Sequence, residues 1–262
     1  MNKLKYFLLA LIFGAIAAAT AFAFRSPPPD DAVVILEYHR VTNDRAADDD
    51  GRAYNVPPAE FSEQLDYLQD NGYHTITMQE YMKARKGKFS LPEKPIILTF
   101  DDGYADNFSE MLPILEAHNM KAVVYMIVNN IGRKDYLTWN ELKEMQRRGV
   151  EIGSHTSDHL PLTTLPENKR RDQVRLSKLL MEWNGINTIF SLSYPNGAYD
   201  EELPPLLKSE DYLNAVTGDP GLNTQDTDPY LLRRINIPRP RLGLLEFRFR
   251  LFKAELCYWL FD

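Results

Sequence analysis

Short apolar runs alternate with longer amphipathic segments along most of the chain after residue 31. A run of four to eight apolar residues predicts a buried strand, and apolar residues that recur every three or four positions predict a helix. On this basis we expect strands at 32–38, 73–77, 96–100, 121–128, 150–153, 189–193, 213–216 and 234–237.

Helices are expected between these strands, at 57–72, 78–85, 107–118, 138–149 and 167–183. Two of them carry start signals, because Pro57-Pro58 opens the first and Thr138 with Glu141 has the form of a capping box. Pro113 should kink or interrupt the helix that contains it. The regular alternation of strand and helix is typical of a parallel α/β sheet.

Polar residues capable of chemistry directly follow several predicted strands. They are His39, Asp101, Asp102, His155 and the turn after Ser193. Because the carboxyl ends of the strands form the active face of an α/β barrel, this placement favours a barrel over an open sheet. We expect one catalytic domain over 32–240, with no internal repeat.

The first residues follow a different pattern. Two lysines precede nineteen uncharged residues, 6–24, a length that approaches the roughly 20 residues needed to span a bilayer. Ala21-Phe22-Ala23 is also an acceptable cleavage site. We therefore expect 1–24 to be a signal peptide or an N-terminal membrane anchor, followed by a linker at 25–31. Both outcomes would export the domain to the membrane, the periplasm or the extracellular space.

Composition removes several classes of function. Without Lys3 and Lys5, 28 basic residues remain against 37 acidic ones, a net charge of −9. Nucleic acid is therefore not an expected partner, since it requires a basic face. The single cysteine, Cys257, allows neither an intrachain disulfide nor a thiolate metal cluster. Any metal must be held by His, Asp or Glu. The oligomeric state is not readable from these features.

Two short segments carry the candidate chemistry. Asp101 and Asp102 end a buried run, and two carboxylates this close would raise one pKa unless a cation separated their roles. His155 and His159 are four positions apart, so both imidazoles can reach one ion from a helical turn. One carboxylate with two histidines leaves coordination positions open, which is typical of a catalytic metal. The alternatives are a surface Asp-Asp-Gly turn and a pair of capping or core histidines.

Together these segments resemble motifs of the polysaccharide deacetylase family (carbohydrate esterase family four, the NodB homology domain). The family's Thr-Phe-Asp-Asp-Gly motif stands here at 99–103, and its His-Ser/Thr-x-x-His motif stands at 155–159. The resemblance covers most of 32–240 and implies an α/β fold of the distorted (β/α)7-type barrel class.

The resemblance also assigns roles to the motif residues. It implies that Asp101 is the general base and that Asp102, His155 and His159 bind a divalent metal, usually zinc. Cobalt, nickel or iron would also suit these ligands.

The third family motif departs from its usual form. It commonly reads Arg-x-Pro-Tyr/Phe-Gly, and the matching segment here is 193–197, with Ser193 in the arginine position. In the family that arginine orients the base, which leaves Arg233 or Arg234 as candidates to reach it instead. The segment also supplies a backbone N–H to the oxyanion, so Asn196 is the candidate donor, the alternative being a plain turn.

The candidate general acid lies early in this sequence and not in the family's usual late motif. The family's late Leu-x-His motif is missing, because no histidine follows His159. The segment 37–41, Glu-Tyr-His-Arg-Val, resembles the early Tyr-His-x-Val segment of the poly-N-acetylglucosamine deacetylase branch, in which this histidine is the acid. We therefore expect His39 to be the general acid, and a buried histidine at a strand end is the alternative.

Aromatic residues supply the remaining candidates. Tyr104 and Tyr199 lie beside motif turns and are candidate sugar contacts, whereas Trp139 and Trp183 are expected in the core. The tail at 241–262 is rich in aromatic residues and leucines with basic residues between them. We expect it to pack on the barrel, and a basic amphipathic helix on a membrane surface is the alternative.

The resemblance implies a metal-dependent hydrolase that removes N-acetyl groups from amino sugars of an envelope or extracellular polysaccharide. Poly-N-acetylglucosamine, peptidoglycan and chitin-like polymers are all candidate substrates. Two alternatives stay open at this point, an O-acetyl esterase of the same fold and a catalytically weakened carbohydrate-binding protein of the envelope.

Overall fold

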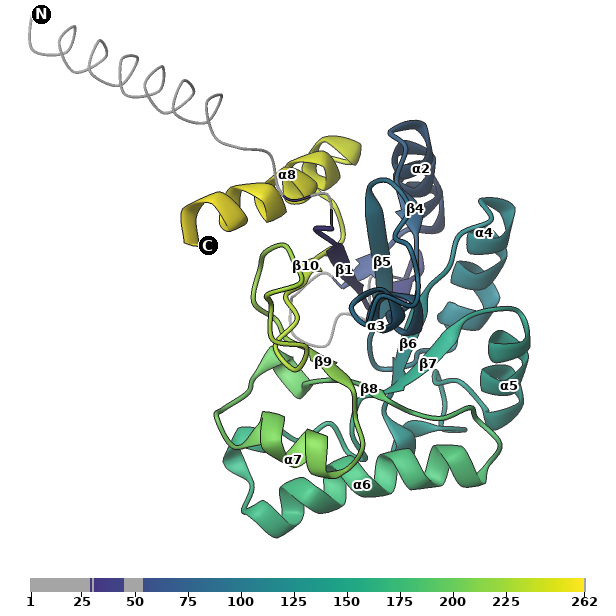
Figure 1. Ribbon diagram of the computed structural model, residues 1–262. Coiled ribbons are helices and arrows are strands. Elements are labelled where there is room, and N and C mark those ends of the chain that lie inside the picture. Colours follow the sequence, from purple (N-terminus) through teal and green to yellow (C-terminus); the bar gives the residue numbers. More distant parts are fainter. Residues whose placement is uncertain (1–28, 30, 45–53, 262) are drawn as a thin grey trace, which may run out of the picture.

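A curled parallel sheet with helices on its outside forms the framework of the protein (Figure 1). The computed structural model describes residues 29, 31–44 and 54–261. The expected signal peptide or anchor at 1–24 and most of the linker lie outside the described residues. Within the described part, no helix has the length and apolar character needed to cross a membrane.

The main sheet contains eight strands, and every pair within it is parallel. Seven follow one path in the spatial order β10, β1, β5, β6, β7, β8, β9. The strands are β1 (Val34–Tyr38), β4 (His74–Thr75), β5 (Pro95–Phe100), β6 (Val123–Met126), β7 (Glu151–Ser154), β8 (Ser191–Ser193), β9 (Asn214–Val216) and β10 (Ile235–Asn236). The short β4 lies off the path and pairs with the first residues of β5.

The chain that leads into β10 joins the two ends of this path. The N–H of Leu232 donates to the carbonyl of Ala215 in β9 at 3.0 Å, and the carbonyl of Leu232 accepts from the N–H of Thr217, just after β9, at 2.8 Å. The same segment then continues as β10, where Ile235 pairs with Leu36 of β1. The expected distorted (β/α)7-type barrel is thereby confirmed, and its distortion lies at this narrow junction.

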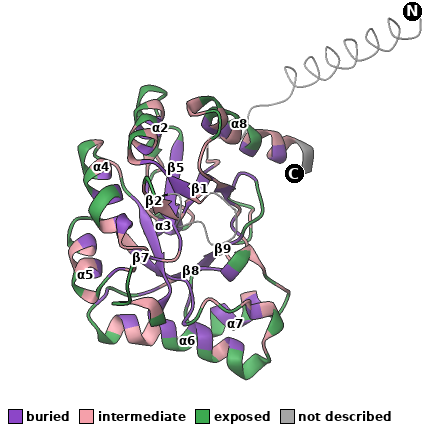
Figure 2. Ribbon diagram, turned by 180° about the vertical axis from the view of Figure 1, so that it is seen from behind, coloured by how far each residue is buried: buried purple, intermediate pink, exposed green. Residues whose placement is uncertain are grey.

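Helices cover the outside of the sheet (Figures 1 and 2). They are α2 (Pro58–Asp70), α3 (Met78–Ala84), α4 (Leu112–Ala117), α5 (Trp139–Arg147), α6 (Glu167–Trp183), α7 (Leu203–Ser209) and α8 (Leu244–Phe261). Capping boxes at Thr77 and Thr138 start α3 and α5. In each, the threonine hydroxyl accepts a hydrogen bond from the N–H of the glutamate three residues later, and the carboxylate of that glutamate accepts one from the threonine N–H. A separate two-stranded pair, β2 (Arg40–Val41) with β3 (Asn55–Val56), follows β1.

The helix expected at 107–118 and the two tryptophans expected in the core can be compared with the structure. The predicted helix at 107–118 is divided into a π-helix, Asn107–Met111, and α4, and Pro113 lies in the first turn of α4, where its missing N–H is not needed. Trp183 was wrongly assigned to the core, because it ends α6 with 79% of its surface exposed. Trp139 is partly buried against the core, as expected.

Strand alternation places the polar residues of the site. Val33, Ile35 and Ile97 belong to a buried cluster separate from the larger one in which Leu36 and Leu98 pack with the helices. Side chains two residues apart share one face of a strand. The face that carries Val33 and Ile35 therefore continues to Glu37, and the face that carries Ile97 continues through Thr99 to Asp101. Charged groups thus come to lie at the carboxyl end of an apolar interior.

The C-terminal tail forms α8, which packs beside α2 and β10 through one side. Phe247, Leu251 and Ala254 are buried, and the ring of Phe247 meets Tyr67 edge to face at 6.1 Å. Arg250 donates to the backbone carbonyl of Asn236 at 3.0 Å. The side chains of α8 therefore belong in part to the core.

Truncation on the two sides of α8 should have different effects. Phe247 is 1% exposed, so Phe247→Ala should lower the free energy of unfolding by about 3–5 kcal/mol. Phe249 is 61% exposed, so Phe249→Ala should change it by less than about 0.5 kcal/mol. Urea unfolding of both variants measures this, and equal effects would contradict the packing described.

Candidate active site

The turn after β5 brings two neighbouring carboxylates to one cavity. Asp102 has a positive φ of 72° and Gly103 one of 77°. This turn lets both Asp101 and Asp102 line the same hollow, although neighbours on a regular strand point to opposite sides. A non-glycine residue in this region costs about 1–3 kcal/mol, a strain that is common at functional sites. The positive φ of Gly103 favours glycine, and a Cβ there would also lie 2.0 Å from the sulfur of Met126, so that side chain would have to move.

Asp102, His155 and His159 offer three ligand atoms that lie within 4.8 Å of one another. Oδ1 of Asp102 is 3.5 Å from Nε2 of His155 and 3.7 Å from Nε2 of His159. The expected helical turn at 155–159 was wrong, because this segment is a loop in which Thr156 and His159 have positive φ values. The loop still brings the two rings to 4.6 Å, and the N–H of His159 donates to Oγ1 of Thr156.

The remaining nitrogen of His155 is already engaged. Nδ1 donates to the backbone carbonyl of Ser193 at 2.8 Å, which leaves the lone pair of Nε2 pointing toward Asp102. Burial lowers the pKa of His155, so the imidazole is neutral near pH 7. One carboxylate and two imidazoles with free nitrogens are a donor set that suits a divalent cation such as zinc. The residues therefore fit the metal that the sequence predicted.

Asp101 is held by Arg234. The guanidinium makes two bonds to the carboxylate, of 2.9 Å to Oδ1 and 2.8 Å to Oδ2, and the hydroxyl of Ser193 donates to Oδ2 at 2.9 Å. Burial alone would raise the pKa of Asp101, but Arg234 and the bonds it donates hold that pKa below its usual range. Of the two arginines named from the sequence, Arg234 is the one that reaches the carboxylate.

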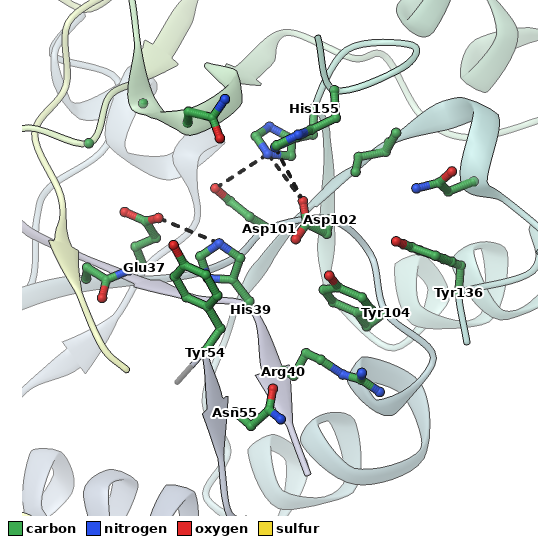
Figure 3. Close-up of a pocket in the computed structure, with 17 residues that line it drawn as sticks. Glu37, His39, Arg40, Tyr54, Asn55, Asp101, Asp102, Tyr104, Tyr136 and His155 are labelled. Carbon is green, nitrogen blue, oxygen red and sulfur yellow. Dashed lines mark ion pairs between the residues drawn. The ribbon is translucent and has the colours of Figure 1, made fainter. Parts of the chain in front are cut away.

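A second cluster surrounds His39 on the other side of Asp101 (Figure 3). Nε2 of His39 is 3.9 Å from Glu37, and Arg234 is 3.6 Å from the other oxygen of Glu37. Glu37, His39 and Asp101 could by distance also hold a metal. However, Arg234 already pairs with both carboxylates of this set, so its positive charge disfavours a cation there. The set containing Asp102 is therefore the better metal site.

The cavity around these groups has a volume of about 610 Å³. One wall is aromatic, because the rings of Tyr104 and Tyr136 stack at 5.1 Å (Figure 3). The guanidinium of Arg40 lies 4.6 Å from the centre of the Tyr104 ring and is fixed by Asp106 at 2.7 Å. Such a wall offers a flat apolar face to a sugar ring beside polar groups.

The cavity contains most of the residues named from the sequence. Tyr104 and Asn196 line it together with the metal-ligand candidates, Asp101 and His39. Tyr199 lies elsewhere, in a separate hollow of about 570 Å³, where its hydroxyl donates to Asp219 at 2.8 Å. The structure therefore does not bring Tyr199 to the other candidates.

Sequence reasoning missed several lining residues. Glu37 and Arg40 belong to the segment 37–41 around His39, and their charges beside a candidate catalytic histidine could have marked them as site residues. Tyr54 and Tyr136 also line the cavity, and Tyr54 stacks obliquely on His39 with 4.3 Å between the ring centres. Both lie in segments without regular periodicity, so the sequence offered no signal for them.

Comparisons with known proteins agree with this geometry. The sequence model of the family described as polysaccharide deacetylase matches residues 88–215. A Bacillus subtilis protein named for this family, YxkH, is 35% identical over 203 residues, which are 78% of this chain and 70% of that protein. The poly-β-1,6-N-acetyl-D-glucosamine N-deacetylase of Escherichia coli K12 is 33% identical over 146 residues, 50% of this chain but only 21% of that protein.

Solved structures share the fold. The deacetylase PplD of Streptococcus pyogenes, determined with acetate, superposes with a TM-score of 0.76 at 24% identity. That match covers 88% of this chain and 99% of the other. The family suggested by the two motifs is thus confirmed: the chain belongs to the polysaccharide deacetylases, which makes it a hydrolase.

Proposed function

We propose that this protein is a metal-dependent hydrolase that removes N-acetyl groups from amino sugars of an envelope or extracellular polysaccharide. The observation that carries the proposal is the buried Asp101, clamped by Arg234 and placed 3.9 Å from His155 of the ligand set. The name of the Escherichia coli relative supports a poly-N-acetylglucosamine-like substrate. The aromatic wall of Tyr104 and Tyr136 supports a sugar ring as the group bound.

Asp102, His155 and His159 would hold the metal, for which zinc is the first candidate. When bound, a divalent ion would supply Lewis acidity toward the acetyl carbonyl and toward water. Asp102 contributes the only charge of this set, and the bond from His155 to Ser193 orients its ring.

The protein's own groups can perform the proton transfers. Asp101 is ionised and takes a proton from the attacking water as general base. Arg234 and Ser193 restrict the carboxylate to one orientation. His39, across the cavity, returns a proton to the leaving amine, and the backbone N–H of Asn196 stabilises the oxyanion. The carboxylate of Glu37 lies 3.9 Å from Nε2 of His39, on the side of the ring away from the metal-ligand set, and can help to orient the imidazole.

Serine at position 193, where the family motif has arginine, favours the alternative of a catalytically weakened carbohydrate-binding protein. Arg234 reaches Asp101 from another part of the chain, which weakens that alternative. An O-acetyl esterase would use the same groups, so a substrate panel must separate the two.

The purified protein supplied with zinc should release acetate from poly-N-acetylglucosamine or peptidoglycan, and a chelator should stop the release. Asp101→Asn should lower the rate by about 10²–10⁴-fold because the base is lost, while the metal content stays the same. Asp172→Asn, an exposed change of the same chemistry on α6, serves as the matched control. Release only from O-acetylated sugars would instead favour the esterase, and unchanged turnover in Asp101→Asn would remove it from the mechanism.

His159→Ala should lose bound metal because one of three ligands disappears. Elemental analysis after dialysis against zinc measures the metal content, with His118→Ala as the control. His118 bonds to Asp66 at 3.1 Å and is not part of the ligand set. Full zinc occupancy in His159→Ala would contradict the assignment.

The Asp101–Arg234 pair also predicts a pH dependence of stability. A carboxyl whose folded pKa lies below its unfolded value stabilises the fold above the unfolded pKa of about 3.9, and this contribution is lost as the pH falls through the folded pKa. Asp101→Asn, measured by urea unfolding with chelator present, should be about 3–5 kcal/mol less stable than the parent at pH 7. This difference should shrink toward pH 3, and a constant difference would argue against the pairing.

A further inference from the structure

Helix α8 carries apolar residues on two opposite sides. Its inner side, with Phe247, Leu251 and Ala254, is buried against the barrel. Its outer side carries Leu245, Phe249 and Phe252, which are 64%, 61% and 40% exposed, and Leu242 just before the helix is 68% exposed. We name Leu242, Leu245, Phe249 and Phe252 the outer stripe. A helix that only covers a barrel in water needs one apolar side, so the outer stripe requires a separate explanation.

Basic residues flank the outer stripe. Arg248 and Lys253 are exposed on its two sides, and Arg241 is exposed at its beginning. The acidic Glu246 is already paired with Arg250 at 2.8 Å, which removes it as a competing charge. The chain as a whole is acidic, with a net charge of −7. An apolar stripe bordered by arginine and lysine on an acidic protein is complementary to an anionic lipid surface.

The start of the described chain lies next to this helix. Pro29 and Ala32 line one hollow together with Glu255 of α8. The nineteen uncharged residues 6–24 precede Pro29 by only a few positions in the sequence. The chain therefore connects to this apolar segment on the side of the barrel where α8 ends. In both views α8 lies at the edge of the molecule (Figures 1 and 2).

We propose that the outer stripe of α8 rests on the surface of an anionic lipid bilayer, with its aromatic and leucine side chains inserted below the headgroups. This contact would hold the barrel against the membrane as a second attachment beside the N-terminal segment. The proposal does not depend on the deacetylase activity. It concerns a helix that lies on the bilayer surface.

Depth-dependent fluorescence quenching tests the contact in the full chain. Cys257→Ala removes the native thiol, and Phe249→Cys then carries an environment-sensitive fluorophore on the outer stripe. The matched control is Glu201→Cys, an exposed position beside α7, at the opposite end of the molecule from α8 (Figure 1). Each labelled protein is reconstituted in vesicles of phosphatidylcholine, with or without phosphatidylglycerol, that contain lipids with nitroxide on the acyl chain. Far-UV circular dichroism and urea unfolding check that each variant is folded.

We expect strong quenching at position 249, an increase with phosphatidylglycerol, and no quenching at position 201. Each basic residue near an anionic surface gives roughly a fivefold gain in partitioning, so Arg248→Glu with Lys253→Glu should abolish the increase. Absence of quenching at 249 would overturn the proposal. A blue-shifted emission without lipid quenching would also overturn it, in favour of a second copy if it depends on protein concentration and of residues 6–24 if it does not.

Discussion

The ion pair between Asp101 and Arg234 is the interaction on which the site depends. Both side chains are almost completely buried, and removal of two charges from water costs several kcal/mol per ion. Such a pair persists only when its geometry is good and its other polar atoms are satisfied. Arg234 meets this condition, because it donates twice to Asp101 and also to the carbonyl of Thr217 at 2.9 Å.

This pair also connects Asp101, the proposed catalytic base, to the segment that closes the barrel. Arg234 belongs to the narrow segment that bonds to β9 and then continues as β10 beside β1. Asp101 follows β5, and Ser193, which donates to it, ends β8. The position of the base is therefore determined by four strands at once, and a shift of the closing segment would move it. The arginine of the family motif would stand at position 193, the last residue of β8, whereas here the positive charge comes from Arg234, directly before β10.

Much of the fold followed from local patterns. Apolar runs located the strands of the main sheet, and capping residues such as Thr138 located helix starts, because both signals depend on neighbours in the sequence. Trp183 was misplaced because its exposure depends on where α6 ends relative to the barrel. The break at Asn107–Met111 was indicated by Pro113, but its form as a π-helix was not.

In the candidate site, too, local motifs could be found from the sequence, whereas contacts between distant segments could not. Asp101, Asp102, His155 and His159 could be named from spacing, yet the reason given for the histidines was wrong, since positive φ values rather than a helical turn bring them together. The choice of Arg234 over Arg233, the role of Glu37 and the separation of Tyr199 depend on contacts between distant segments. Contacts of this kind produce no recognisable pattern in a single sequence.

One wall of the cavity has little freedom to move. Gly197 and Gly218, which both line it, come so close that a Cβ on Gly197 would be 2.4 Å from the nitrogen of Gly218. Backbone meets backbone there without side chains between, so the turns after β8 and β9 must shift together or not at all. A bulkier substrate of the proposed kind would therefore have to be accommodated by other lining residues, such as Tyr54 and Asn55, which lie at the start of the small β2–β3 pair.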